Sequence, residues 1–211
     1  MKAFPAKAAA KTALATAAVA LALISSGCTA SGEPDTSPPL PDTTDSTSDG
    51  GLGVKLLTES DLPPGFSEVQ LPTVKGGMGA LIGCPALDVR PSEQVGEASV
   101  SFAGGTAGSL ITESIRMVTA AQSRQALEDL AAVPKQCSNA KTASVSTMGT
   151  QSTAIRVTAT PPELGIGIDG YIVGIRDEQT VVVVVFVSPG TADPAAAEAV
   201  AKTAWEKASL Q

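Results

Sequence analysis

Few side chains in this sequence could carry out chemistry, because the chain contains no histidine. Histidine is the commonest general base and the commonest metal ligand in proteins, so zinc hydrolysis and histidine-containing triads are excluded. A serine nucleophile would need a lysine base instead, and no GxSxG turn presents a serine for attack. The lysines available in the second half of the chain stand in predicted loops or in the last predicted helix: Lys135, Lys141, Lys202 and Lys207. We therefore expect the protein not to be an enzyme and to need no metal or cofactor.

One glycine pattern could indicate a nucleotide site. Residues 165–170 read GIGIDG and match the GxGxxG pattern of dinucleotide-binding proteins. That site needs a strand before the glycines and a helix after them, whose N-terminus holds the pyrophosphate. Here Pro161-Pro162 precede the glycines and a predicted strand follows, so we interpret these residues as a loop. Residues 104–109 also predict a loop, and they lack the lysine of a phosphate-binding loop.

Charged residues within the predicted strands are the candidates for a binding site. They are Glu113, Arg116, Arg156 and Arg176. These side chains could line a polar cleft, or they could lie on an exposed face of the sheet, where most charged residues of proteins are found. Both alternatives remain open at this point.

The first 27 residues have the pattern of an export signal. Residues 1–11 carry three lysines and no acid, and residues 12–24 are an unbroken run of small to medium-sized, largely apolar residues. A membrane-spanning helix needs about 20 apolar residues, so the run is too short for a permanent span and predicts a cleaved signal peptide.

The residues that end this signal, LISSGC at positions 23–28, resemble the lipobox of bacterial lipoproteins. In that motif small residues precede a cysteine whose thiol receives diacylglycerol before cleavage. The resemblance implies that residues 1–27 are removed and that acylated Cys28 anchors the protein on the extracytoplasmic face of the cell membrane. The alternative is an ordinary secretory signal, with Cys28 incidental.

Residues 28–51 predict an acidic tether behind this anchor. They contain five acids, no bases and several prolines, and almost no apolar side chains to bury, so we expect an extended, disordered segment. Because the three lysines of residues 1–11 leave with the signal, 11 basic residues remain against 21 acidic ones, a formal charge of −10. Nucleic acid is therefore excluded as an expected partner.

Residues 52–211 predict a single domain of the α+β class, with an antiparallel sheet of about five to six strands and two main helices. Alternating patterns predict strands over residues 97–103, 110–118, 153–159, 171–176 and 179–187. Asp177-Glu178 is the expected tight turn between the last two strands. The valine run 181–187 is apolar at every position, which is typical of a central strand covered on both faces.

Capping patterns mark the two main helices. Thr119 and Gln122 have the spacing of a capping box, and the helix that follows is expected to end at Pro134. Asp193-Pro194 begins the second helix, and its apolar stripe is expected to cover one face of the sheet: Ala197, Val200, Ala201, Ala204 and Ala208.

The cysteine count fits an exported protein. If Cys28 is acylated, Cys84 and Cys137 are left as a single possible disulfide pair. Free thiols are unusual outside the cytoplasm, so we predict that these two residues are bonded.

The domain is similar to the extracellular sensor-like domains of actinobacteria, of the kind found on the kinase PknH and in related surface lipoproteins. The similarity is carried by residues 56–58 and 61–66 at the domain start, Cys84-Pro85, residues 99–102, the helix before Cys137, and the closing valine-rich strand and helix. It implies an antiparallel sheet packed with helices and a cleft for an unknown ligand. No kinase domain is present in the chain, so sensing would require a partner protein.

Three functions remain on these observations. We expect a non-enzymatic ligand-binding or sensor-type domain presented to the cell envelope. The first alternative is a carrier of lipid or another hydrophobic ligand, in which the sheet and helices enclose an apolar cavity. The second alternative is an accessory subunit of an envelope complex.

Overall fold

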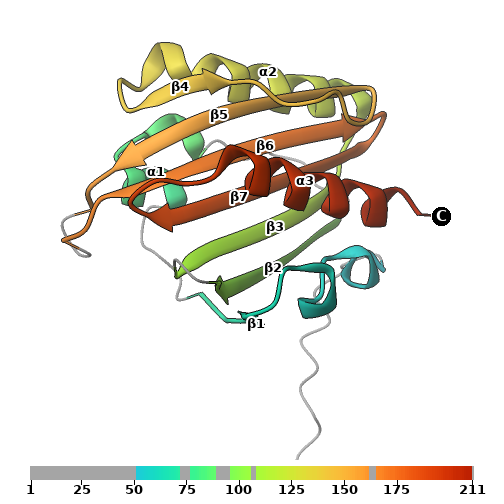
Figure 1. Ribbon diagram of the computed structural model, residues 1–211. Coiled ribbons are helices and arrows are strands. Elements are labelled where there is room, and N and C mark those ends of the chain that lie inside the picture. The colour runs from blue at the N-terminus through green and yellow to red at the C-terminus, as the bar shows by residue number, and fades with distance from the viewer. Residues whose placement is uncertain (1–50, 72–76, 89–95, 106–107, 162–164, 211) are drawn as a thin grey trace, which may run out of the picture. The chain divides into compact units, whose positions relative to one another are not determined.

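The computed structural model describes residues 51–71, 77–88, 96–105, 108–161 and 165–210. These residues form one antiparallel sheet of seven strands in the order β1-β2-β3-β7-β6-β5-β4 (Figure 1). The strands are β1 (Phe66–Glu68), β2 (Gly96–Gly104), β3 (Ser109–Met117), β4 (Ala140–Ala143), β5 (Gln151–Ala159), β6 (Ile168–Asp177) and β7 (Thr180–Pro189). The predicted signal peptide, Cys28 and almost all of the tether lie outside the described residues.

Helices cover both faces of the sheet. Helix α3 (Pro194–Ser209) crosses one face, while α2 (Ala120–Gln136) and the short α1 (Gly77–Ile82) pack on the other (Figure 1). Three short 3₁₀ helices complete the described part: η1 (Leu52–Lys55), η2 (Glu59–Asp61) and η3 (Pro85–Leu87). The α+β class is confirmed, with one or two more strands than expected and an additional short helix.

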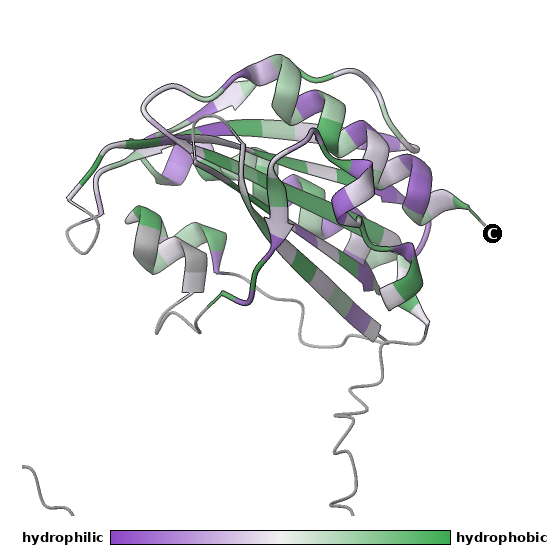
Figure 2. Ribbon diagram, turned by 60° about the horizontal axis from the view of Figure 1, so that its bottom comes forward, coloured by the Kyte–Doolittle hydropathy of each residue, from purple (hydrophilic) through white to green (hydrophobic). Residues whose placement is uncertain are grey.

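Strand β7 is the central strand, as its valine run predicts. Val182, Val184 and Phe186 belong to the core beneath α3. Val183 and Val185 point to the opposite face and pack against the core beneath α1 and α2. Because both faces of β7 are covered, its side chains are apolar without alternation, and the hydropathy colours show the same apolar character in the middle of the sheet (Figure 2).

Both main helices begin at their predicted caps. The hydroxyl of Thr119 accepts from the Gln122 backbone N–H and the Gln122 side chain accepts from the Thr119 N–H, which confirms the capping box. Asp193 caps α3 by accepting from Ala195 N at 2.9 Å. The predicted apolar stripe of α3 is buried against the sheet.

Helix α2 continues past Pro134, so the prediction that it ends there is wrong. A proline lacks a backbone N–H and therefore removes a single hydrogen bond of the helix. The last turn is still closed by Cys137 N–H, which donates to Val133 O at 2.9 Å, and the helix ends at Gln136.

Two predicted loops are shifted by the pairing of the strands. Asp177 pairs with Thr180, so the β6–β7 turn is Glu178-Gln179 instead of Asp177-Glu178. Gly104 pairs with Ser109, so these two residues belong to β2 and β3, and the loop between them is residues 105–108. Residues 106–107 of that loop lie outside the described residues.

A disulfide joins Cys84 to Cys137, with the Cα atoms 5.6 Å apart, which confirms the predicted pair. It connects the segment between α1 and η3 to the end of α2. Because the two cysteines are 53 residues apart in sequence, the crosslink is worth about 4 kcal/mol in the chain-entropy model.

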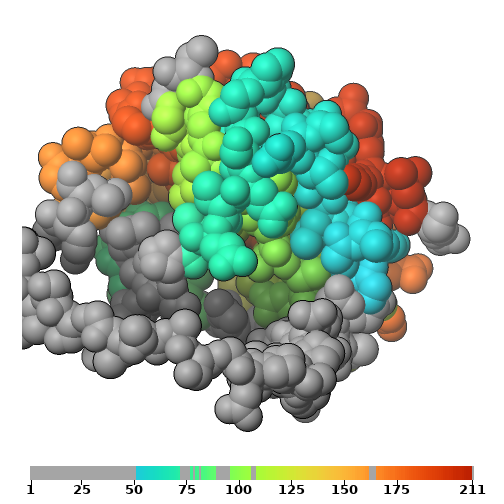
Figure 3. Space-filling view, turned by 90° about the horizontal axis from the view of Figure 1, so that it is seen from below, coloured from blue at the N-terminus to red at the C-terminus, as the bar shows by residue number. Residues whose placement is uncertain are grey.

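Residues 52–62, which precede β1, pack on the α3 side of the sheet. Leu52, Leu56, Leu57 and Leu62 are buried in the core beneath α3. In the space-filling view these residues, in cyan, lie between the green atoms of β2 and β3 and the red atoms of α3 (Figure 3). No helix among the described residues is both long and apolar enough to cross a membrane.

Candidate functional site

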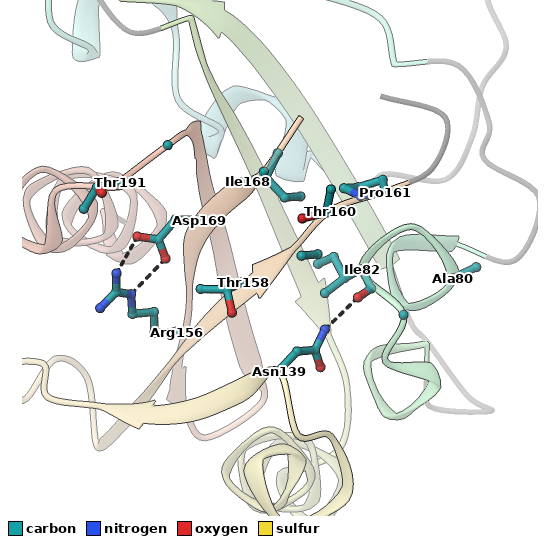
Figure 4. Close-up of a pocket in the computed structure, with 14 residues that line it drawn as sticks. Ala80, Ile82, Asn139, Arg156, Thr158, Thr160, Pro161, Ile168, Asp169 and Thr191 are labelled. Atoms are coloured by element: carbon teal, nitrogen blue, oxygen red, sulfur yellow. Dashed lines mark hydrogen bonds and ion pairs between the residues drawn. The ribbon is translucent and has the colours of Figure 1, made fainter. Parts of the chain in front are cut away.

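A groove lined by both polar and apolar residues lies where β5 ends and β6 begins (Figure 4), and we call it the polar groove after its charged pair and threonines. It has a volume of about 630 Å³, and its walls come from the end of β5, the start of β6, α1, Asn139 and the Gly190-Thr191 turn before α3. This volume is within the range of small-ligand sites.

Strand β5 and Thr160, the residue that follows it, supply a polar stripe to the groove. Arg156, Thr158 and Thr160 line it, and they share one face because side chains of a strand alternate. Thr158 and Thr160 are exposed, and the Arg156 side chain is 42% exposed. The stripe therefore offers hydroxyl and guanidinium groups to solvent or to a ligand.

Arg156 is held in place by Asp169 of β6. Its Nε donates to Asp169 Oδ1 at 2.8 Å and its Nη2 donates to Oδ2 at 2.6 Å. The Asp169 side chain is only 4% exposed, and its Oδ2 also accepts from Ala192 N at 3.0 Å. The Arg156 guanidinium holds the pKa of Asp169 below its usual value, and Asp169 raises the pKa of Arg156.

This pair orients Arg156 and leaves part of it available. The guanidinium also lies over the Tyr171 ring, 6.0 Å from the ring centroid. Its Nη1 makes no hydrogen bond within the described part of the chain. A bound acceptor could therefore use Nη1 without breaking the ion pair with Asp169.

The opposite wall of the groove is fixed through Asn139. Its Nδ2 donates to Ile82 O at 2.7 Å, and its backbone oxygen accepts from Thr158 N at 3.0 Å. Asn139 follows Cys137 by two residues, so the disulfide to Cys84 ties the same two segments together. Asn139 thus joins the α1 wall to the β5 wall by hydrogen bonds, and the disulfide reinforces its link to the α1 side.

The other sequence candidates lie elsewhere. Arg116 pairs with Glu97 at 3.1 Å, and Arg176 Nε donates to Gln151 at 2.9 Å. Glu113 is fully buried in the core beneath α3, and neither it nor the two arginines line this groove. Arg156 is the one candidate of the four that the structure places there.

A second groove is mainly apolar and lies between α3 and the chain before β1. It has a volume of about 660 Å³. Leu62, Pro64 and Phe66 form one side, with Phe186 and Val200 also lining it. Two buried serines in the lining, Ser109 and Ser188, hydrogen bond to each other at 2.6 Å.

The remaining motifs do not form a recognisable catalytic or nucleotide site. Residues 168–170 of the GxGxxG match begin β6 instead of a helix, so the pyrophosphate cradle is missing. Lys135 lies in α2 and Lys141 in β4, not in loops, and Lys207 pairs with Asp61 at 2.5 Å. Within the described residues, no group of three or more acids and cysteines is placed to hold a metal ion.

Comparisons with known proteins give a likeness in fold. No protein-family model matches the chain, and no curated protein matches it by sequence. The extracellular domain of PknH from Mycobacterium tuberculosis, a crystal structure, is similar with a TM-score of 0.54 and 13% identity. The match covers 76% of this chain and 95% of that domain, so the two share a fold.

Proposed function

We propose that this protein is a membrane-anchored lipoprotein whose domain binds a ligand outside the cytoplasm without catalysing a reaction. The fold supports the proposal, since it is shared with an extracellular domain. The Cys84–Cys137 disulfide supports it too, because structural disulfides persist mainly in oxidising compartments. The lipobox-like residues 23–28 provide the anchor.

The polar groove is the proposed ligand site, and the Arg156–Asp169 pair carries this assignment. An exposed guanidinium is fixed by a nearly buried carboxylate, and the groove around it has a fitting volume. Preorganised donors lower the cost of binding because little side-chain freedom is lost. We further propose that a signal from this site passes to a partner protein in the envelope.

A matched pair of variants tests the ligand site. Ala80 lines the groove and is exposed, so Ala80→Trp should block it with little effect on folding. Ala131 is an exposed alanine of α2 that does not line the groove, and Ala131→Trp is the control. Thermal shifts are measured against soluble envelope glycans, peptides and metabolites. A compound that stabilises the wild type and Ala131→Trp, but not Ala80→Trp, supports the proposal, and no response to any class would refute it.

The anchor is tested separately by detergent phase partition. The wild-type chain expressed in a bacterial host should enter the detergent phase, because two acyl chains anchor a protein stably. Cys28→Ser, which cannot be acylated, should move to the aqueous phase once its signal is cleaved, or to the precursor fraction if it is not. Equal partition of both mature proteins would refute lipid anchoring.

The apolar groove favours a second candidate function, carriage of a hydrophobic ligand. Its walls of leucine, proline, phenylalanine and valine could contact the apolar part of a ligand, and its serine pair could hydrogen bond to one polar group of that ligand. Native mass spectrometry of the purified protein should show bound lipid if this is the function. Ala199 lines the groove whereas Ala195 does not, so Ala199→Trp should lose the adduct and Ala195→Trp should keep it. A wild-type spectrum free of adducts would count against a carrier.

A further inference from the structure

Helix α3 turns a wall of mostly small side chains toward the apolar groove. The residues of α3 that line it are Ala196, Ala199, Val200 and Thr203. Their spacing of three and four residues places them on one face of the helix. From Ala196 to Thr203 this wall is about 10 Å long. Because alanine side chains end at Cβ, the wall leaves room along its length for a hydrocarbon chain.

The strand residues that line the groove change from apolar to polar along β7. Phe186 and Ser188 both line it, and they share one face because they are two residues apart. Ser109 of β3 lies beside Ser188, one position beyond the pairing of Leu110 with Val187, and the two serine hydroxyls are 2.6 Å apart. A ligand could therefore lay an apolar chain on Phe186 and place a polar group on the serine pair.

The serine pair has one hydroxyl hydrogen to spare. Two hydroxyls carry two hydrogens, and the bond between them uses one. Ser109 is 5% exposed and Ser188 is 3% exposed, and within the described residues neither hydroxyl makes a second hydrogen bond. A buried donor without an acceptor costs free energy. The pair therefore favours a ligand that brings an oxygen acceptor.

The groove offers no uncompensated charge to a ligand. Its acids are Asp61 and Asp193, and no lysine or arginine is among the described residues that line it. Asp61 is paired with Lys207 at 2.5 Å. Asp193 caps α3, where the positive end of the helix offsets its charge. An anionic head group would find no free cation here, and a cationic one would find both carboxylates already engaged.

We propose that the apolar groove binds an uncharged single-chain lipid, whose carbonyl or hydroxyl oxygen accepts a hydrogen bond from the Ser109–Ser188 pair. This inference rests on the carrier function proposed above for the same groove. The volume of about 660 Å³ is within the range of small-ligand sites. Binding buries the hydrocarbon chain between α3 and residues 62–66, and the acceptor satisfies the spare serine hydrogen.

Nuclear magnetic resonance of the ¹⁵N-labelled protein with Cys28→Ser tests this inference. The substitution removes the acylation site, so no attached acyl chain competes for the groove. The probes have hydrocarbon chains of similar length and differ in charge: methyl decanoate is uncharged, decanoate is an anion at pH 7 and decyltrimethylammonium is a cation. The Thr142 amide, which lies in β4 outside the groove, is the internal control.

Methyl decanoate should shift the amide signals of Ser109 and Ser188 and leave that of Thr142 unchanged. It should bind at least about tenfold more tightly than either ion, because a charged head group would lose water without gaining a partner.

Two pairs of variants locate the ligand. Replacing Ser109 and Ser188 together by alanine should weaken binding of methyl decanoate about threefold to tenfold, through the lost hydrogen bond. The control is Ser101→Ala with Thr112→Val, which removes a hydrogen-bonded hydroxyl pair of β2 and β3 that does not line the groove; it should bind like the wild type. Ala199→Trp should abolish binding of every probe, and Ala195→Trp should retain it.

The possible results separate this inference from the function on which it rests. If decanoate or decyltrimethylammonium binds as tightly as methyl decanoate and Ala199→Trp abolishes that binding, the groove remains a carrier site and the uncharged class is wrong. If the double serine variant binds methyl decanoate like the wild type, the assigned role of the serine pair is refuted. If no probe binds, or if all bind equally to Ala199→Trp, both the inference and the carrier function fail.

Discussion

Glu113 should make the stability of the domain depend on pH in the neutral range. Its side chain is fully buried on β3. Oε2 accepts from Leu57 N at 2.6 Å, and Oε1 has no partner within the described part of the chain. Lys207 of α3 and Asp61 of η2 are the charged groups that act on it. Burial raises the pKa of Glu113 from 4.5 to about 7, because water is removed from the carboxylate.

The direction in which the free energy of unfolding changes with pH follows from proton binding. As the pH rises above 4.5, the unfolded chain loses this proton while the folded protein keeps it, so the free energy of unfolding falls until the folded pKa is passed. For pKa values of 4.5 and about 7, this loss is about 2.5 kcal/mol between pH 5 and pH 8. The acids with lowered pKa values are Asp61, Asp169 and Glu198. They lose their protons at lower pH than Glu113 does, so the window from pH 5 to pH 8 isolates Glu113.

Urea unfolding of the wild type and of Glu113→Gln at pH 5 and pH 8 measures the effect. The amide cannot ionise, so Glu113→Gln should show a pH dependence smaller than the wild type's by about 2.5 kcal/mol. Glu128→Gln, at an exposed glutamate of α2, should keep the wild-type dependence. Equal stability of the wild type at both pH values, or the same slope in Glu113→Gln, would refute the reasoning.

Three further predictions concern the groove and the sheet. Replacing both Cys84 and Cys137 by serine should lower the free energy of unfolding by about 2–5 kcal/mol, measured by urea unfolding; an unchanged midpoint would show that the crosslink is dispensable. Asp169→Asn should lower the melting temperature by a few degrees and broaden the Arg156 Nε–H signal in nuclear magnetic resonance spectra, because the guanidinium loses its charged partner. An Nε–H signal as sharp as in the wild type would contradict this. Gly170→Ala should destabilise the sheet by about 2 kcal/mol, since the added methyl group would lie 2.6 Å from a carbonyl oxygen of β7; wild-type stability by calorimetry would show that the strands separate easily.

The parts of the fold that sequence predicts are those with strong local patterns. The valine run of β7 and the alanine-rich stripe of α3 indicate burial by composition alone. The caps at Thr119 and Asp193 fix where helices begin, because they satisfy exposed backbone N–H groups. The disulfide follows from the number of cysteines once Cys28 is set aside.

The elements that sequence did not predict depend on distant partners. Strand β1 has three residues and β4 has four, too few to show an alternating pattern, and each is defined by its pairing with a longer strand. Helix α1 has six residues, two of them glycines, which disfavour a helix on their own. Its place in the fold depends on packing against β5 and on the nearby disulfide.

The site residues are predictable only in part, for the same reason. The sequence predicts Arg156 as a candidate because it is a charged residue within a predicted strand, whereas its partner Asp169 falls in the predicted glycine loop. Asp169 lies two residues before Tyr171. A predicted strand that began at residue 168 instead of 171 would therefore place Asp169 on the same face of the sheet as Tyr171. Burial of Glu113 could not be predicted, because it depends on Leu57 and its neighbours packing over β3.

The intact mass of the protein extracted from bacterial membranes tests the central claim most directly, because anchoring decides where the domain meets its ligand. The account predicts a chain that begins at residue 28 and carries diacylglycerol on Cys28, with Cys84 and Cys137 bonded. A mature chain with an unmodified Cys28, or a membrane protein that retains residues 1–27, would contradict it.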